Sequence, residues 1–564
     1  MREEAKKIIT KKLEFIYEGC DSGKMLEQID KVAEKYNRHT DVNSTLSEKD
    51  VMVITYGDSI KDKGEKGFAT LNKFFRKYVK DAVSTIHLLP MFTYTSDDGF
   101  SVVDYKEINP DLGGWDDVNE LSKRYGLMID AVVNHISKSS KWFQNFLKGE
   151  EPYTEYFIEC DKDADYSSVT RPRALPLLTE FDTANGKKYV WTTFSDDQID
   201  LNFKSEKVFL EILDVLFDYA ANGAKFIRLD AIGFMWKELG TTCMHLSKTH
   251  EIIKVYRAIL EEYMPGTKFI TETNVPHQDN ISYFGDGDEA HLVYQFPLPP
   301  LTMFSILTQN AEKLTKWAID LGGPLEGTTY FNFLSSHDGI GVRPVEGILT
   351  REEQQVLIDA TLTNGGVVSY KDNGDGTKSP YELNINYQDA LASPEDSDEL
   401  RIQRFLAAET ILLSLQGVPG IYIHSLLGSR NDYYGMETSG IPRRINREKL
   451  DYKKLEQSLS EDSNRKKIFD EMIRRLNIRR QYEMFSPLSH QTVLSVDKRV
   501  FALERFAPGS NKKIKVLVNV SLEEVNTEMK CAGIDLLSGE EISSNVTIKP
   551  LQCMWILEKG NYNN

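Results

Sequence analysis

Short runs of β-branched and other apolar residues alternate with longer amphipathic segments through most of this chain. We interpret eight of these runs as strands, because helical patterns lie between most of them. Eight strands separated by helices favour a closed parallel (β/α)₈ TIM barrel, an α/β fold, over an open sheet. The predicted strands are 51–56, 85–89, 127–134, 225–230, 268–273, 292–296, 330–335 and 420–424.

Four segments depart from this alternation and predict further parts of the chain. Residues 1–50 read as a helical N-terminal extension. The stretch 139–197, after the third strand, is too long for a simple loop and predicts an inserted domain. A second insertion is expected at 343–401, before the eighth strand. The catalytic barrel would then occupy 51–138 and 198–490.

The C-terminal part, 491–564, changes to short apolar runs that follow one another closely, which predicts a separate antiparallel β domain. These runs are 493–496, 500–506, 514–520 and 546–557.

The charge balance restricts the partners that we expect. The chain has 68 Lys and Arg against 86 Asp and Glu, a formal net charge of −18. That excess argues against nucleic acid or an anionic membrane as partner. Five scattered cysteines show neither a disulfide framework nor metal-ligand spacing, and the charged N-terminus lacks the apolar core of a signal peptide. We therefore expect a cytoplasmic protein, with a homodimer as one open alternative.

Polar clusters follow the third, fourth, fifth and seventh predicted strands. Because the carboxyl ends of barrel strands meet at one face, we expect these clusters to form one site. Glycoside cleavage needs two carboxyl groups, one on each side of the bond that breaks. The clusters are Asp130-Ala-Val-Val-Asn134-His135, Arg228-Leu-Asp230-Ala231, Thr271-Glu272-Thr273-Asn274 and Ser335-Ser-His337-Asp338.

Their local surroundings suggest different roles for three carboxylates. Asp230 lies two residues after Arg228, so we expect its pKa to be low, which suits a nucleophile. Glu272 follows an apolar strand and is expected near another anion, so its pKa should be raised, as a general acid requires. Asp338 would then be a third carboxylate that binds sugar hydroxyls.

The segments DAVVNH, IRLDA, ITETN and SSHD resemble, in order and spacing, the four signature regions of the α-amylase superfamily of glycoside hydrolases. The resemblance extends over most of the chain from about residue 51. It implies a retaining mechanism with Asp230 as nucleophile, Glu272 as general acid/base and Asp338 as transition-state stabiliser. It implies that the glucose subsite is completed by Arg228, His135 and His337.

Further stretches resemble the sucrose phosphorylase subfamily, among them SDDGFSVVDYKEINPDLGGWDDV, WTTFSDDQIDLNF and SPYELNINYQDAL. That resemblance implies that Asp97 and Arg443 hold glucose hydroxyls and close the pocket behind one sugar. It implies that Phe194 and Gln198 flank the reacting bond. The expected substrate is therefore a terminal glucosyl unit, not the interior of a polymer.

Phosphate as a second substrate would account for the sequence Arg171-Pro172-Arg173. Proline stiffens this loop, and a guanidinium group matches the geometry of a phosphate. An anionic substrate of a chain with net charge −18 requires such a local cation. The resemblance assigns the phosphate contact to Arg173, together with Tyr381.

The acceptor side departs from the sucrose phosphorylases. Asn274 stands where they have a His, and Glu382 stands where they have a Gln. With the N-terminal extension, these differences resemble the glucosylglycerate phosphorylases, which cleave 2-O-α-D-glucosyl-D-glycerate with phosphate into α-D-glucose 1-phosphate and D-glycerate. Candidate cations for the glycerate carboxylate are Arg171, Arg173 and Lys237. Sucrose or sucrose 6′-phosphate phosphorylase and plain α-glucoside hydrolase remain alternatives.

We expect no metal and no cofactor. Asn134 matches a position that binds structural calcium in many α-amylases, but the sucrose phosphorylase branch generally lacks that ion, so a hydrogen-bonding role is expected. Residues 371–376 (KDNGDG) lack the alternating ligands of a calcium loop and predict a Gly-rich turn.

Overall fold

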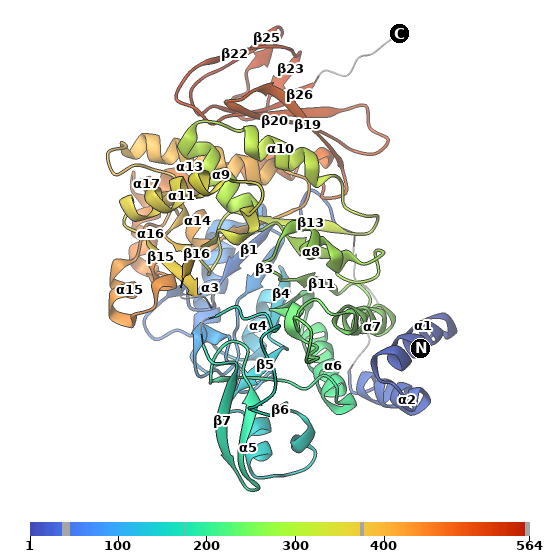
Figure 1. Cartoon of the computed structure of the whole chain (residues 1–564). Coiled ribbons are helices and arrows are strands. Elements are labelled where there is room, and N and C mark those ends of the chain that lie inside the picture. The colour runs from blue at the N-terminus through green and yellow to red at the C-terminus, as the bar shows by residue number, and fades with distance from the viewer. Residues whose placement is uncertain (37–44, 174, 373–376, 559–564) are drawn as a thin grey trace.

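The computed structural model describes residues 1–36, 45–173, 175–372 and 377–558. Eight parallel strands close into a barrel, and the chain visits them in order around the ring. The expected TIM barrel is confirmed, and each expected strand begins within two residues of an observed one. The barrel strands are β1 (Met52–Thr55), β3 (Thr85–Leu88), β4 (Gly126–Ala131), β10 (Ala224–Leu229), β11 (Lys268–Thr271), β12 (Leu292–Tyr294), β13 (Thr329–Phe333) and β17 (Val418–Tyr422). Figure 1 shows barrel strands β1, β3, β4 and β11 in the middle of the molecule and the strands of the C-terminal part at its top.

The observed strands end earlier than the sequence pattern indicated. β10 ends at Leu229 and β11 at Thr271, so that Asp230 and Glu272 lie just beyond their strands, on the turns that follow. Strand residues of this barrel are buried on both faces, as expected for parallel strands covered by helices. The carboxylates thereby reach the open end of the barrel.

Amphipathic helices surround the barrel. α6 (Glu206–Ala221) is representative, since Phe209, Ile212 and Leu216 are buried on its inner face. No helix within the described ranges is long and apolar enough to span a membrane. The other helices of eight or more residues in this part of the chain are α3 (Gly67–Phe74), α4 (Trp115–Ser122), α7 (Ser247–Tyr263), α9 (Leu298–Thr308), α10 (Glu312–Leu321), α11 (Arg351–Thr363), α13 (Asp398–Ser414), α16 (Tyr452–Ser460) and α17 (Asn464–Arg479).

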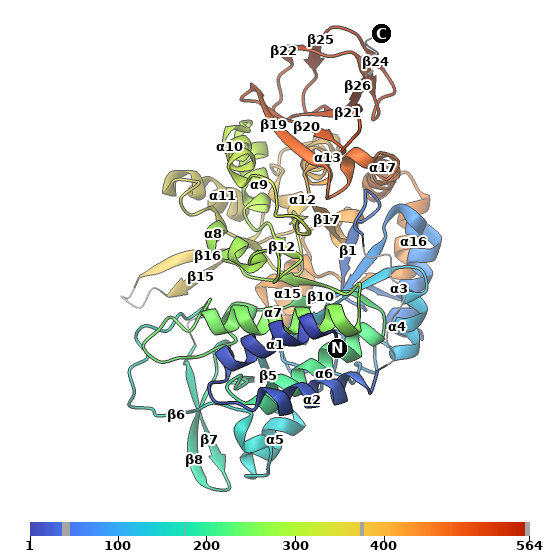
Figure 2. The ribbon, with the colours of Figure 1, turned by 90° about the vertical axis from the view of Figure 1, so that its right-hand side faces the viewer.

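Two N-terminal helices lie outside the barrel, α1 (Glu3–Ile16) and α2 (Ser22–Ala33). α1 packs on α7 and α2 packs on α6, which Figure 2 shows as two blue helices beside the green pair. Polar contacts add to this packing: the Tyr17 hydroxyl donates to the Phe203 carbonyl at 3.1 Å, and Lys12 Nζ lies 2.7 Å from Glu251 Oε2. The extension is therefore part of the folded body of the protein.

The segments after β4 and after β13 contain small sheets of their own. The first forms a β5–β9 pair and a β6–β8–β7 sheet, and the second forms a β14–β16–β15 sheet. Residues 373–376, in which most of the expected Gly-rich turn falls, lie outside the described residues. The strands are β5 (His135–Ser137), β6 (Glu159–Cys160), β7 (Leu178–Thr183), β8 (Gly186–Trp191), β9 (Gln198–Asp200), β14 (Ile340–Gly341), β15 (Val367–Asp372) and β16 (Lys378–Asn384).

The C-terminal part is antiparallel, as expected, with one six-stranded sheet and one two-stranded sheet. The prediction of a single run over 546–557 is wrong, because Pro550 and Leu551, the latter at φ 54°, form a turn that divides it. Its two halves join different sheets. The strands are β19 (His490–Asp497), β20 (Val500–Phe506), β21 (Lys513–Asn519), β22 (Val525–Lys530), β23 (Gly533–Asp535), β24 (Glu541–Ile542), β25 (Asn545–Ile548) and β26 (Cys553–Glu558).

Because α1 belongs to the hydrophobic core, truncating its inner face should destabilise the whole protein. Leu13 is 0% exposed. We expect Leu13→Ala to lower the free energy of unfolding by about 2–5 kcal/mol. Lys11→Ala, on the exposed side of the same helix, should change it by less than about 0.5 kcal/mol. Urea unfolding followed by circular dichroism measures both, and equal effects would show that the helix does not contribute to the core.

Candidate active site

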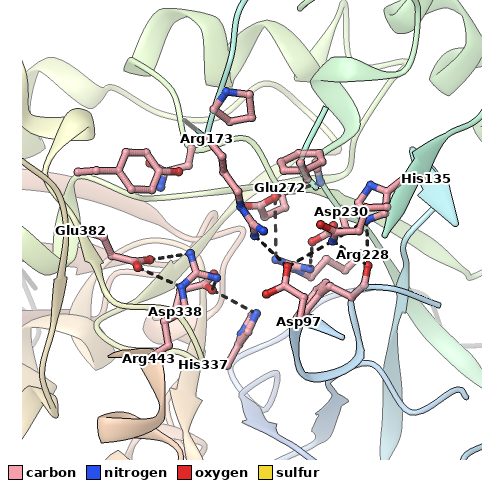
Figure 3. A pocket seen from close by; sticks show the side chains of 17 residues that line it. Asp97, His135, Arg173, Arg228, Asp230, Glu272, His337, Asp338, Glu382 and Arg443 are labelled. Carbon is pink, nitrogen blue, oxygen red and sulfur yellow. Dashed lines mark hydrogen bonds and ion pairs between the residues drawn. The ribbon is translucent and has the colours of Figure 1, made fainter. Parts of the chain in front are cut away.

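A cavity opens at the carboxyl ends of the barrel strands. The structure brings the residues expected to catalyse the reaction or to bind glucose, phosphate and the acceptor to its lining, apart from two candidate cations described below (Figure 3). Three further residues complete the lining, namely Phe100, Pro172 and Ala231. The expected residues are Asp97, His135, Arg173, Phe194, Gln198, Arg228, Asp230, Glu272, Asn274, His337, Asp338, Tyr381, Glu382 and Arg443.

A buried guanidinium group lies at the base of the cavity. Arg228 is 2% exposed, and its neighbour across the β4–β10 pairing is Asp130, so the two side chains meet in an ion pair. Arg228 also donates to Asp230 Oδ1 at 2.8 Å and to the Tyr294 hydroxyl at 3.0 Å. The expected contact between Arg228 and Asp230 is therefore present.

Glu272 lies close to the same guanidinium group. Its Oε2 is 4.0 Å from Arg228 Nη2 and accepts a hydrogen bond from the Ala231 backbone at 3.1 Å. Ala231 has a φ of 47°, the left-handed region that non-glycine residues seldom adopt. This turn after β10 directs its N–H toward Glu272, and it links the two catalytic candidates through the backbone.

Burial raises the pKa of both carboxyls in the unliganded cavity. Burial, opposed by Arg228, raises the pKa of Asp230 to about 8, and burial also raises the pKa of Glu272. The expectation of a low pKa for Asp230 is therefore wrong, because loss of hydration outweighs its Arg228 contact. Two such neighbours titrate as a pair, and their raised pKa values favour a shared proton over two adjacent anions. The shorter contact of Arg228 with Asp230 favours placing that proton on Glu272.

Asp338 has the opposite electrostatic environment. Its burial favours the neutral form, but the positive charges of Arg443 and Arg447 outweigh that effect and hold its pKa well below the usual range. Arg443 Nη1 lies 2.8 Å from Asp338 Oδ1. Burial lowers the pKa of His337 to about 3, so this ring is neutral. Asp338 is consequently an anion at neutral pH.

Glu382 is paired with the same arginine. Arg443 Nε and Nη2 donate to its two oxygens at 3.0 and 2.9 Å, a bidentate pair visible in Figure 3. Glu382 is buried, and Arg443 thus serves two carboxylates, Glu382 and Asp338. The sequence analysis treated Glu382 as a direct acceptor contact, whereas its charge is already matched by Arg443.

The opposite wall is built around Asp97. Arg173 Nη2 donates to Asp97 Oδ2 at 2.8 Å, and Gln198 Nε2 reaches the same oxygen at 3.3 Å. His135 Nε2 lies 2.9 Å from the Phe100 carbonyl oxygen, and its ring is 5.1 Å from that of Phe194. These contacts join the loop after β3 to the inserted segment after β4.

Two of the three candidate cations for an acceptor carboxylate lie away from the cavity lining. Lys237 is 5% exposed and donates to Asn134 Oδ1 at 3.0 Å, and it lies 2.6 Å from Asp200 Oδ2. Arg171 is exposed and donates to the Leu175 carbonyl. Arg173 is the candidate that lines the cavity. Within the described residues, no cluster of three or more His, Cys, Asp or Glu could hold a metal ion.

Sequence reasoning missed several residues of the site. Phe100 stacks on His337 with ring centroids 5.0 Å apart and planes inclined by 10°. An aromatic residue in a glycine-containing loop gives no sequence signal for such a role. Asp130 belonged to a predicted cluster, but its ion pair with Arg228 and the hydrogen bond of Tyr294, two strands away on β12, were not inferred. Asn274 Oδ1 is buried without a hydrogen-bond partner in the described structure and can accept from a ligand.

Comparisons with known proteins agree with this geometry. Residues 55–339 match the family described as the alpha-amylase catalytic domain. The chain is 47% identical over 515 residues to a glucosylglycerate phosphorylase of Escherichia coli (strain K12), over 90% of this chain and 92% of that protein. A glucosylglycerate phosphorylase of Spirochaeta thermophila is 48% identical over 84% of this chain and 81% of its own length.

More distant relatives include a sucrose phosphorylase of Streptococcus mutans, 31% identical over 70% of this chain and 81% of that protein. The crystal structure of sucrose 6F-phosphate phosphorylase from Thermoanaerobacter thermosaccharolyticum superposes with a TM-score of 0.75 at 24% identity, covering 90% of this chain and 100% of that one. That likeness shows the fold.

The raised pKa of Asp230 predicts that this residue costs the protein stability. Above about pH 4 an unfolded Asp has released its proton, whereas the folded pair of Asp230 and Glu272, in which the pKa of Asp230 is raised to about 8, retains one over this range. The unfolded state then binds fewer protons, so stability falls as pH rises. Asp230→Asn should therefore become more stable than wild type by up to about 1.4 kcal/mol per pH unit over this range.

Urea unfolding at several pH values measures this difference. Asp97→Asn is the matched control, because a lowered pKa keeps Asp97 ionised in both states over this range and gives no pH-dependent difference. A constant difference between Asp230→Asn and wild type at all pH values would contradict the assignment.

Proposed function

We propose, from the premise that the chain belongs to the alpha-amylase family, that it is a retaining glycoside phosphorylase acting on 2-O-α-D-glucosyl-D-glycerate. Inorganic phosphate is the second substrate, and the products are α-D-glucose 1-phosphate and D-glycerate. The observation that carries the proposal is the near 50% identity, over most of the chain, to proteins named glucosylglycerate phosphorylase. Identity to sucrose phosphorylases is much lower.

The first half of the reaction uses the two carboxyls of the pair. Asp230 Oδ attacks the anomeric carbon, and the bond from that carbon to the glycerate oxygen breaks. Glu272 gives its proton to this oxygen, so that glycerate leaves with a neutral hydroxyl group. Proton sharing in the unliganded pair supports these roles, because Arg228 favours the ionised form of Asp230 more than that of Glu272.

In the second half, a phosphate oxygen attacks the anomeric carbon from the side that glycerate has left. The bond to Asp230 breaks, and Glu272 accepts the proton of the attacking phosphate group. Two inversions give α-glucose 1-phosphate. Asp338 stays ionised beside Arg443 and can stabilise positive charge that develops on the sugar.

One cation can serve both anionic substrates, since glycerate leaves before phosphate enters. Arg173 lines the cavity beside the carboxylate pair, while Arg171 and Lys237 are engaged elsewhere. Its guanidinium group could bind the glycerate carboxylate in the first half and phosphate in the second. Pairing of Glu382 with Arg443 removes the repulsion that a free carboxylate would exert on either anion.

Asn274 supports a small hydroxylated acceptor. Its free Oδ1 faces the cavity and can accept a hydrogen bond from a glycerate hydroxyl. We also propose a cytoplasmic location, which the five cysteines support because none is joined in a disulfide.

The acceptor test is a comparison in the synthetic direction. With α-glucose 1-phosphate as donor, D-glycerate should react roughly 10- to 150-fold more efficiently (kcat/KM) than D-fructose, since a charge-assisted hydrogen bond contributes about 1.5–3 kcal/mol. Fructose 6-phosphate and glycerol are the comparison acceptors. Because glycerol lacks the carboxylate of glycerate, the difference between their kcat/KM values measures the contribution of that group. Preference for fructose would refute the glycerate assignment. Release of free glucose without phosphate would refute phosphorolysis, and a β-phosphate product would refute the role of Asp230.

Substitution of Arg173 tests the shared cation. Arg173→Ala should raise KM for glycerate and for phosphate alike, by roughly tenfold or more each. Hydrolysis of α-glucosyl fluoride, which needs neither anion, should persist. Arg171→Ala, two residues away on the same loop, is the matched control and should leave both KM values unchanged. An effect on one anion alone would show that the two bind different cations.

A further inference from the structure

A second cavity lies beside the active-site cavity and shares none of its lining residues. Its lining includes two aromatic rings, Tyr56 and Tyr94, and the charged side chains of Asp98, Arg444 and Arg447. Aromatic faces with charged hydrogen-bonding groups around them suit a sugar ring. The reaction proposed above assigns no role to this space.

Consecutive residues separate the two cavities. Asp97 lines the first cavity and Asp98 the second, and Arg443 lines the first while Arg444 lines the second. The turn that contains Asp97 and Asp98 and the turn that contains Arg443 and Arg444 therefore both lie on the boundary between the two cavities. The partition between the cavities consists of these two turns and the side chains that join them.

Ion pairs of Asp98 close this partition. Asp98 Oδ1 lies 2.6 Å from Arg444 Nη2, and its Oδ2 lies 2.6 Å from Arg447 Nη1. Arg447 also donates from Nε to the His337 carbonyl at 2.6 Å, and its Nη2 is 3.9 Å from Asp338 Oδ1. Its guanidinium group thus reaches from the lining of one cavity to that of the other. We call Asp98, Arg444 and Arg447 the Asp98 clasp.

The clasp is fixed by its local structure. Asp98 has φ 47°, a left-handed conformation, and its carboxylate receives both guanidinium groups. Burial opposes ionisation, but Arg444 and Arg447 lower the pKa of Asp98 to about 2, so these ion pairs persist at neutral pH. Among the residues described, no ion pair joins Asp97 to Arg443, the pair expected to close the pocket. Asp97 instead contacts Arg173, and Arg443 contacts Glu382.

We propose that the Asp98 clasp is the wall that limits the donor to one glucosyl unit, and that the second cavity is an occluded subsite for a further sugar. The proposal rests on the proposed function, in which a glucosyl group occupies the first cavity. Arg173 and Asn274, which face the acceptor, do not belong to the clasp. A sugar entering the second cavity would therefore be attached to the reacting glucose on its non-reducing side.

The test compares α-glucosyl fluoride with α-maltosyl fluoride as donors, with inorganic phosphate as acceptor. Asp98→Gly removes the carboxylate and relieves the left-handed backbone, and Arg444→Ala removes the 40% exposed arm of the clasp. Each should raise the ratio of kcat/KM for maltosyl over glucosyl fluoride by about tenfold or more. Lys61→Ala, which alters the second cavity without touching the clasp, should leave the ratio unchanged. α-Isomaltosyl fluoride distinguishes a 1,6-linked from a 1,4-linked second sugar.

The outcomes separate this inference from the proposed function. If wild type uses α-glucosyl fluoride but neither variant gains activity on a disaccharide donor, the clasp is not the limiting wall. Equal use of maltosyl and glucosyl fluoride by wild type would also overturn the inference. Failure of wild type to form α-glucose 1-phosphate from α-glucosyl fluoride and phosphate would instead overturn the proposed function. If Asp98→Gly loses activity on both donors, the ratio of kcat/KM values measured for Arg444→Ala decides whether the clasp is the limiting wall.

Discussion

The buried guanidinium group of Arg228 is the interaction on which the site depends. A charge taken out of water is tolerated only where its partners are close and its hydrogen bonds are satisfied. The barrel meets that requirement through strand register, since Asp130 stands opposite Arg228 on the neighbouring strand and Tyr294 accepts from its Nε. The same Nη1 that meets Asp130 also donates to Asp230, so these contacts fix the donor that Asp230 uses. The orientation of the proposed nucleophile is thus a consequence of pairing between β4 and β10.

The carboxylates of the cavity differ in how many arginine side chains lie close to them, and their pKa values differ accordingly. Asp338 has Arg443 at 2.8 Å and Arg447 at 3.9 Å, so its ionised form is favoured in spite of burial. Asp230 and Glu272 have only a share of Arg228, and burial raises the pKa of both. One carboxylate therefore remains an anion while the pair retains a proton. A retaining glycoside reaction needs this combination, because one carboxyl must give up a proton while another stabilises positive charge.

Local patterns in the sequence were sufficient for the barrel, since each strand is a short apolar run and each motif follows a strand end. They failed where the outcome depended on a partner or on burial. Glu382 was interpreted as a residue of the acceptor side, but it is paired with Arg443, which lies 61 residues further along the chain. Lys237 was interpreted as a candidate ligand, but its ammonium group is held by Asn134, 103 residues before it. Adjacency of Arg228 and Asp230 predicted their contact correctly, but the extent of burial, which raises the pKa, is not encoded in two neighbouring residues.

The position of Arg173 bears on how a chain with net charge −18 could exchange two anions at one place. A free guanidinium group in a cavity would bind the first anion tightly and release it slowly. Here Asp97 already occupies part of the Arg173 fork at 2.8 Å. Arginine has five N–H donors, so an incoming carboxylate or phosphate can bind the remaining donors without displacing Asp97. Partial neutralisation by Asp97 lowers the affinity for either anion, and it also holds the guanidinium group in place between them. In the proposed reaction this favours fast departure of glycerate and prompt entry of phosphate before water reaches the glucosyl-enzyme.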